Sequence, residues 1–204
     1  LCTGRFFEKN AEALSKEFRV ITMDPRGQGF SSKTVGGNTI RRHAQDIKEL
    51  IDHLRLESVV LLGWSLAASI VAEYAVQFRL AGLVMMDGSL FPFSNESWNH
   101  HRGRGYNVQN WHSVYMPLFY NPTKFYEKFF QRIGLREEDR EWVTAECRLA
   151  MPWSALELHY DFCHTDNVSK LPKITVPTAF FGAASRDYGL EMPNTFASRV
   201  SGYS

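Results

Sequence analysis

The chain of 204 residues is long enough to bury a hydrophobic core, and its 44% hydrophobic and 22% charged residues are ordinary for a globular protein. The formal net charge of +1, with no apolar run long enough to cross a bilayer, argues against a nucleic-acid partner and a membrane span. The three cysteines are too few and too scattered for a disulfide framework, so we expect a reducing, cytoplasmic setting.

The first quarter of the chain alternates between helical and strand-like patterns. A helix is expected within 3–18, followed by a short apolar strand over 18–23 that ends at Asp24. Asn38 or Thr39 is placed to cap a further helix over 40–54, which has one apolar face. The two histidines of that helix, His43 and His53, are expected on its surface.

The next segment repeats the pattern with shorter connections. A strand over 58–62 leads into Gly63 and Ser65, a helix of small and apolar residues follows, and a strand over 82–86 ends at Asp87. Strand–helix–strand units with short links predict a parallel sheet, and continuously apolar strands predict burial on both faces. In such sheets the chemistry lies beyond the carboxyl ends of the strands, where Asp24, Ser65 and Asp87 are expected.

The stretch Gly63-Trp64-Ser65-Leu66-Ala67 is the strongest local signal of chemistry. It differs by one residue from Gly-x-Ser-x-Gly, a sharp strand-to-helix turn that exposes a nucleophilic serine. Small flanking residues fit such a turn because bulky neighbours would obstruct it. Taken alone, the pattern also fits a serine that follows a buried strand by chance.

Residues 91–170 have a different character, with dense aromatic residues and no convincing buried strand. Helices are expected from Pro122 to Gly134, over 136–150, and from a capping box formed by Ser154 and Glu157. A strand over 178–181 follows and ends at Gly182. The segment 91–170 is therefore predicted to be a helical insertion into a parallel sheet.

Three motifs in this order resemble the α/β-hydrolase family. They are the loop Asp24-Pro25-Arg26-Gly27-Gln28-Gly29-Phe30-Ser31, the turn at 63–67, and the return into the sheet over 171–182. The resemblance implies an α/β fold, a mostly parallel doubly wound sheet with an inserted helical cap. It divides the chain into a first core part (1–90), a cap (91–170) and a second, incomplete core part (171–204).

The resemblance also implies residues that the sequence does not contain. Family members carry an oxyanion loop before a region like 1–14, and a histidine in a loop after one more strand. No histidine follows Asp187. We therefore expect the sequence to be an internal piece of a longer hydrolase. The catalytic histidine would lie beyond Ser204, and the second oxyanion donor would lie around or before Leu1.

Three residues carry the catalysis that the resemblance implies. Ser65 is the candidate nucleophile, and the backbone N–H of Leu66 is a candidate oxyanion donor. The acid is Asp87 at the end of the strand over 82–86, or Asp187, which lies two residues beyond the usual position after Gly182. Asp87 is favoured because its segment closely resembles that of members carrying the acid there. The residues Asp24, Arg26 and Gly29 are expected to shape a loop near the site.

Neither a metal nor a cofactor is expected. His159 and Cys163 share a helix face, with Asp161 and Asp166 nearby, but His164 is rotated away, so one helix does not direct these side chains at one point. The glycine–arginine stretch 102–105 is expected in a cap loop. The aromatic residues of the insertion suit a roof over an apolar pocket, while Phe125 and Phe129 suit the core of the cap itself. The roof would comprise Phe91, Phe93, Trp98, Trp111, Tyr115, Phe119 and Tyr120.

These features predict a serine hydrolase that cleaves an ester, lactone or related acyl bond of a largely apolar small molecule. Serine at the turn disfavours the dehalogenase and epoxide-hydrolase chemistries of this family, which use an aspartate there. Hydrolysis of carbon–carbon bonds and cofactor-free haloperoxidase activity remain alternatives on the same scaffold. A ligand-binding or signalling protein with little turnover is the alternative from another class. The sequence carries no signal for the oligomeric state.

Overall fold

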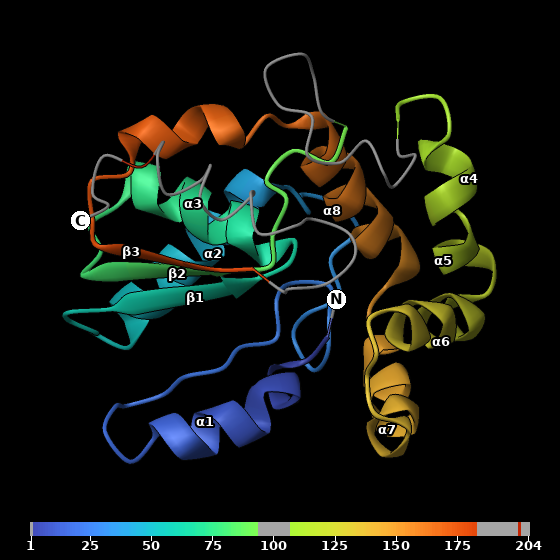
Figure 1. Ribbon diagram of the computed structural model, residues 1–204, viewed down its shortest axis with the longest axis horizontal. Helices are drawn as coiled ribbons and strands as arrows, with labels where there is room; N and C mark the ends of the chain where they lie inside the picture. The colour runs from blue at the N-terminus through green and yellow to red at the C-terminus, as the bar shows by residue number, and fades with distance from the viewer. Residues whose placement is uncertain (1, 94–106, 183–199, 201–204) are drawn as a thin grey trace. The chain divides into compact units, whose positions relative to one another are not determined.

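A computed structural model describes residues 2–93, 107–182 and 200 (Figure 1). The chain forms two compact units, one comprising 1–38 and 112–158 and the other comprising 39–111 and 159–204. This division groups the first 38 residues with most of the helical segment, whereas the motifs suggested limits at 90 and 170. We call the first the helical unit and the second the sheet unit.

Among the residues that the structure describes, the sheet unit contains three parallel strands in the order β1-β2-β3. They are β1 (Val60–Trp64), β2 (Gly82–Met86) and β3 (Thr178–Phe181). The register places Trp64 beside Met86, and Met86 beside Phe181, so the carboxyl ends of all three strands are level. The predicted parallel sheet is confirmed. Two strands have the predicted limits, while β1 begins two residues later than expected.

Three further described elements lie wholly within the sheet unit: α2 (Ile40–His53), α3 (Ala67–Gln77) and the 3-10 helix η3 (Val168–Lys173). Figure 1 shows α3 and η3 on the same side of the sheet. The core forms there because these elements bring together the buried side chains of Ala68, Val71, Ala72, Leu83, Met85, Leu90, Val168, Leu171, Ile174 and Val200. The connections β1–α3–β2 are the predicted strand–helix–strand unit.

The opposite side of the sheet is partly exposed, contrary to the prediction that the strands are buried on both faces. Val60 and Leu62 are 58% and 44% exposed, and Phe181 is 58% exposed. Successive side chains alternate across a strand, so the core around α3 and η3 covers only every second residue. Gly63 in β1 and Leu83 and Met85 in β2 belong to the buried set.

The helix α2 begins as predicted but differs in the position of one histidine. The Thr39 side chain accepts a hydrogen bond from Arg42 N, which makes Thr39 the N-cap. His53 is exposed as expected, but His43 is buried at 3% exposure, so its predicted surface position is wrong. His43 lies three residues after the buried Ile40 and therefore shares its helix face.

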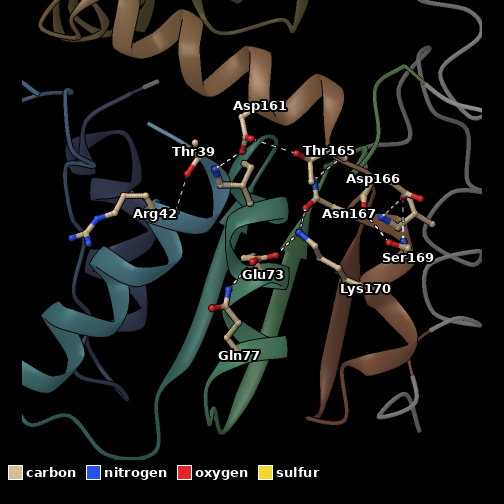
Figure 2. Close-up of polar contacts among 12 residues, drawn as sticks. Thr39, Arg42, Glu73, Gln77, Asp161, Thr165, Asp166, Asn167, Ser169 and Lys170 are labelled. Carbon is tan, nitrogen blue, oxygen red and sulfur yellow. Dashed lines mark hydrogen bonds and ion pairs between the residues drawn. The ribbon is translucent and has the colours of Figure 1, made fainter. Parts of the chain in front are cut away.

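Polar contacts fasten the segment 161–170 to α2 and α3 (Figure 2). The Lys170 ammonium forms an ion pair with Glu73 on α3 and donates a hydrogen bond of 2.7 Å to Asn167 Oδ1. Gln77 Nε2 donates to the other Glu73 oxygen over 2.6 Å. Asp161 accepts a 2.7 Å hydrogen bond from Ile40 N at the start of α2. Figure 2 shows Lys170 reaching the face of α3 that carries Glu73 and Gln77.

The helical unit contains η1 (Gly4–Phe7), α1 (Glu8–Leu14), α5 (Pro117–Tyr120), α6 (Pro122–Arg132) and α7 (Glu137–Cys147). Two more helices, α4 (Trp111–Tyr115) and α8 (Pro152–His164), belong in part to each unit. Its core comprises Leu118, Tyr126, Phe130, Val143, Cys147 and Ala155. Phe125 and Phe129 pack against this core as predicted, and the described residues 107–177 contain no strand.

Two predictions for the helical unit are wrong. Residues 18–23 form no strand, because a strand needs a hydrogen-bonded neighbour and none is present among the described residues. The side chains of Phe18 and Ile21 in this stretch are 62% and 41% exposed. Ser154 does not cap α8, which begins earlier at Pro152. The Ser154 hydroxyl donates to Thr34 O over 2.8 Å, and Glu157 accepts from Gly37 N and Asn38 Nδ2.

None of the described helices combines the length and the hydropathy that a membrane crossing requires.

Replacing Lys170 by methionine should lower the free energy of unfolding by about 2 kcal/mol, because the poorly exposed Glu73 carboxylate loses its counter-ion. Urea denaturation of both proteins measures the loss. Lys173→Met is the matched control, since Lys173 is exposed at the end of the same 3-10 helix and should change stability by less than about 0.5 kcal/mol. Equal losses in the two variants would contradict a stabilising role for the Lys170–Glu73 pair.

Candidate active site

The site begins at the turn between β1 and α3. Ser65 has φ +56°, in the left-handed region that few residues other than glycine occupy. Two backbone hydrogen bonds hold this conformation. Ser65 N donates to Met86 O on β2 over 2.8 Å, and Ser65 O accepts from Ala68 N in the first turn of α3 over 3.0 Å. The turn therefore has the strand-to-helix geometry that the motif predicted.

Two glycines allow the backbone segments at this turn to approach closely. A Cβ at Gly63 would overlap the Ala67 carbonyl oxygen and lie 2.7 Å from the Ala67 carbonyl carbon and from Val71 Cγ2. A Cβ at Gly88 would overlap Ala68 Cβ and lie 2.7 Å from Ser65 O. Both positions therefore require glycine for space. Gly63 is part of the sequence motif, whereas Gly88 was not singled out from the sequence. The pattern that could have indicated Gly88 is a glycine directly after the aspartate that ends a strand.

Leu66 follows the serine as the N-cap of α3. The first N–H groups of a helix have no acceptor within the helix, and the helix dipole gives this end a partial positive charge. The Leu66 N–H is among these groups and lies one residue from the Ser65 side chain. An anion that forms beside Ser65 would therefore meet a favourable electrostatic environment.

Asp87 is held at the end of the neighbouring strand. It has φ +46°, and its N–H donates a 2.7 Å hydrogen bond to Phe181 O at the end of β3. Trp64 and Met86 are paired across β1 and β2, so Ser65 and Asp87, which follow them, lie at the same level of the sheet. Adjacent strands of a sheet lie about 4.8 Å apart. Asp87 is half-buried, and the alternative acid, Asp187, lies outside the described residues.

The loop that follows Asp24 belongs to the helical unit. The Asp24 carboxylate accepts hydrogen bonds of 2.7 Å from Gly4 N and from Phe30 N, and Ser31 Oγ donates to Asp24 O over 2.6 Å. Gly29 has φ +47°, and a Cβ there would overlap the Asp24 carboxylate. Asp24 and Gly29 therefore shape this loop, as expected, while its predicted closeness to the site stays a prediction.

The side chains considered as metal ligands are engaged in structural contacts. Asp161 binds Ile40 N, and Asp166 accepts from the backbone N–H groups of Val168 and Ser169 at the start of η3. The His164 ring stacks on Tyr160 at a centroid distance of 3.8 Å. In residues 2–93 and 107–182, no three side chains of the metal-binding types gather as one group. His100, His101 and the stretch 102–105 lie outside the described residues.

Two of the aromatic residues that were predicted to form a roof over a pocket pack instead in or against the cores of the two units. Phe91 packs against the core of the sheet unit, and Tyr115 is buried in the helical unit, with its ring 6.5 Å from that of Phe125. Phe119 and Tyr120 are exposed, and Trp98 lies outside the described residues. A roof over an apolar pocket stays a prediction.

Residues 3–133 match the model of a protein family described as alpha/beta hydrolase fold. The chain belongs to the α/β-hydrolase fold family. This is an enzyme family, and the match covers both the Asp24 loop and the turn at Ser65. The fold inferred from the three motifs is thereby confirmed.

Solved structures of this family resemble the chain over nearly all of its length. An esterase from Exiguobacterium antarcticum has a TM-score of 0.87 at 20% identity, covering 98% of this chain and 77% of the esterase. A bromoperoxidase from Bacillus anthracis has a TM-score of 0.86 at 21% identity, covering 98% of this chain and 77% of the bromoperoxidase. At these identities the likeness establishes the fold alone.

Another relative matches a shorter part of this chain. The soluble epoxide hydrolase of Corynebacterium sp. (strain C12) is 36% identical over 67 residues, which are 33% of this chain. The aligned segment spans 23% of that relative's own length.

Substituting Gly88 by alanine should lower the free energy of unfolding by about 2 kcal/mol, because the added methyl group overlaps Ala68 and crowds Ser65 O. Chemical denaturation measures the effect. Gly82→Ala, at the other end of the same strand, is the control, since its Cβ would meet no atom closer than 3.5 Å. A Gly88→Ala protein as stable as the Gly82→Ala protein would show that the turn can move away from β2.

Proposed function

We propose that the chain carries the nucleophile and the acid of a serine hydrolase. The observation that supports this most directly is the left-handed backbone of Ser65 at the turn from β1 into α3. This conformation directs the residue out of the regular strand and places the next N–H at a helix N-terminus. Asp87 follows the adjacent strand, within the same unit.

In the proposed reaction, Ser65 Oγ attacks the carbonyl carbon of the substrate while a histidine removes the hydroxyl proton. The Leu66 N–H donates a hydrogen bond to the oxyanion that develops on the carbonyl oxygen. Asp87 accepts a hydrogen bond from the histidine and orients it. The protonated histidine then releases the leaving group, and water hydrolyses the acyl-enzyme.

The proposed substrates are esters, lactones or related acyl compounds, because serine nucleophiles act by acyl transfer. The name of the relative from Corynebacterium indicates epoxide hydrolysis for that protein. The same activity is not proposed here, since members of this family with that chemistry use an aspartate where this chain has Ser65. An apolar small molecule remains the proposed substrate class, in keeping with the aromatic residues of the insertion.

Ser65→Ala should abolish labelling of the full-length protein by a fluorophosphonate probe and lower kcat for p-nitrophenyl esters by about 10⁴-fold or more. Gel fluorescence and initial rates measure the two effects. Ser69→Ala, in the first turn of the same helix, is the control and should retain both. Labelling that survives in Ser65→Ala would exclude Ser65 as the nucleophile. A wild-type protein that neither labels nor turns over would favour the ligand-binding alternative.

Asp87→Asn should lower kcat by about 10⁴-fold, because the amide favours the wrong tautomer of the catalytic histidine. Asparagine tolerates a positive φ, so the backbone at this position should be preserved. The pH–rate profile of the full-length protein supplies a second readout, since a purely structural role would not move the pKa of the catalytic histidine. Asp187→Asn is the comparison. A large loss in Asp187→Asn with a small loss in Asp87→Asn would assign the acid to Asp187.

A further inference from the structure

Two cysteines that are distant in sequence lie side by side in the helical unit. The Cys147 thiol, at the end of α7, donates a hydrogen bond of 3.4 Å to Cys2 Sγ, and both are free thiols. A disulfide bond is about 2.05 Å long, so the two sulfurs need to approach by only about 1.4 Å to form one.

The neighbouring residues hold this pair in position. Glu146 accepts a hydrogen bond from Thr3 Oγ1, and its other oxygen lies 3.0 Å from the Arg5 guanidinium. The same guanidinium lies over the Trp142 ring, with 4.6 Å between Arg5 Cζ and the ring centroid. Residues next to each cysteine are therefore bound to one another, which keeps the two thiols facing each other without a covalent bond.

The two thiols differ in exposure and in acidity. Cys147 is fully buried in the core of the helical unit, whereas Cys2 is partly exposed at its edge. The hydrogen bond from Cys147 lowers the pKa of the Cys2 thiol, while the same bond and burial raise the pKa of Cys147. The thiolate form, which reacts with oxidants, is therefore favoured at Cys2, the residue of the pair that is partly exposed.

We propose that Cys2 and Cys147 are a redox-sensitive pair, which peroxides convert into a disulfide that fastens the segment 2–7 to α7. The Cys2 thiolate attacks one oxygen of hydrogen peroxide, the O–O bond breaks, and hydroxide leaves, giving a sulfenic acid at Cys2. The Cys147 thiol then loses its proton and attacks the Cys2 sulfur. The S–O bond breaks, water leaves, and the disulfide forms.

The second step is helped by the first. The largest cause of the raised pKa of Cys147 is its hydrogen bond to Cys2, and the charge of Cys2 contributes further. When Cys2 becomes a neutral sulfenic acid, it no longer accepts this hydrogen bond as a thiolate. It also no longer repels the negative charge that forms on Cys147. Cys147 can then ionise more readily at the moment when it must act as the nucleophile.

The disulfide should also raise the melting temperature, because it links residues 2 and 147 and so constrains most of the unfolded chain. For a chain of this size we expect an increase of about 5–10 °C in Tm.

The test treats the reduced full-length protein with a small excess of hydrogen peroxide, blocks free thiols under denaturing conditions, and analyses tryptic peptides by mass spectrometry. We expect a disulfide between the peptide that ends at Arg5 and the peptide 141–148, which contains only Cys147. The oxidised protein should show the higher Tm, and dithiothreitol should reverse both changes.

Two variants separate this pair from general thiol oxidation. Cys2→Ser should lose both the disulfide and the rise in Tm, while Cys163→Ala should keep both, since Cys163 belongs to the sheet unit. The proposal is overturned if the cross-link involves the peptide 149–170 that contains Cys163. It is equally overturned if Cys2 is oxidised to a sulfinic acid without forming a bond, or if the bond leaves Tm unchanged.

Discussion

The close approach of the β1–α3 turn to the end of β2 determines the geometry of the candidate site. Ser65 N is hydrogen-bonded to Met86 O, and neither Gly63 nor Gly88 has space for a Cβ. The conformation of Ser65 is therefore set by the pairing of two strands as well as by the helix that follows it. The same packing positions the Leu66 N–H and Asp87, so the three candidate groups depend on one contact between backbone segments.

The helix that follows the serine, α3, is itself held by neighbouring elements of the sheet unit. α2 packs on α3, and the segment 161–170 is joined to both helices through Asp161, Lys170 and Glu73. Catalytic groups are positioned more accurately on regular elements than on free loops. Polar contacts remote from Ser65 thus tie α3, the helix that begins beside the candidate nucleophile, to two other segments of the sheet unit.

The sequence predicted what depends on local patterns. The strands over 82–86 and 178–181 were found because apolar runs end at a sharp break, and the serine turn was found because its glycine is part of a motif. Predictions failed where distant contacts decide. His43 is buried on α2, a helix that packs on α3. Ser154 binds a backbone oxygen 120 residues away instead of capping its helix, and the stretch 18–23 has no strand partner among the described residues. The role of Gly88 depends likewise on a close approach that only the folded backbone reveals.

The left-handed backbone of Ser65 has a consequence for the stability of the whole chain. A residue with a side chain is less favourable there than glycine by about 1–2 kcal/mol, because its Cβ crowds the following carbonyl group. Glycine would relieve this strain, while its greater freedom in the unfolded chain would offset about 0.5–1 kcal/mol of the gain, and the hydroxyl group would be lost. Under the proposed function, the fold thus exchanges part of its thermodynamic stability for a reactive side chain, and selection for thermostability alone would favour loss of the nucleophile.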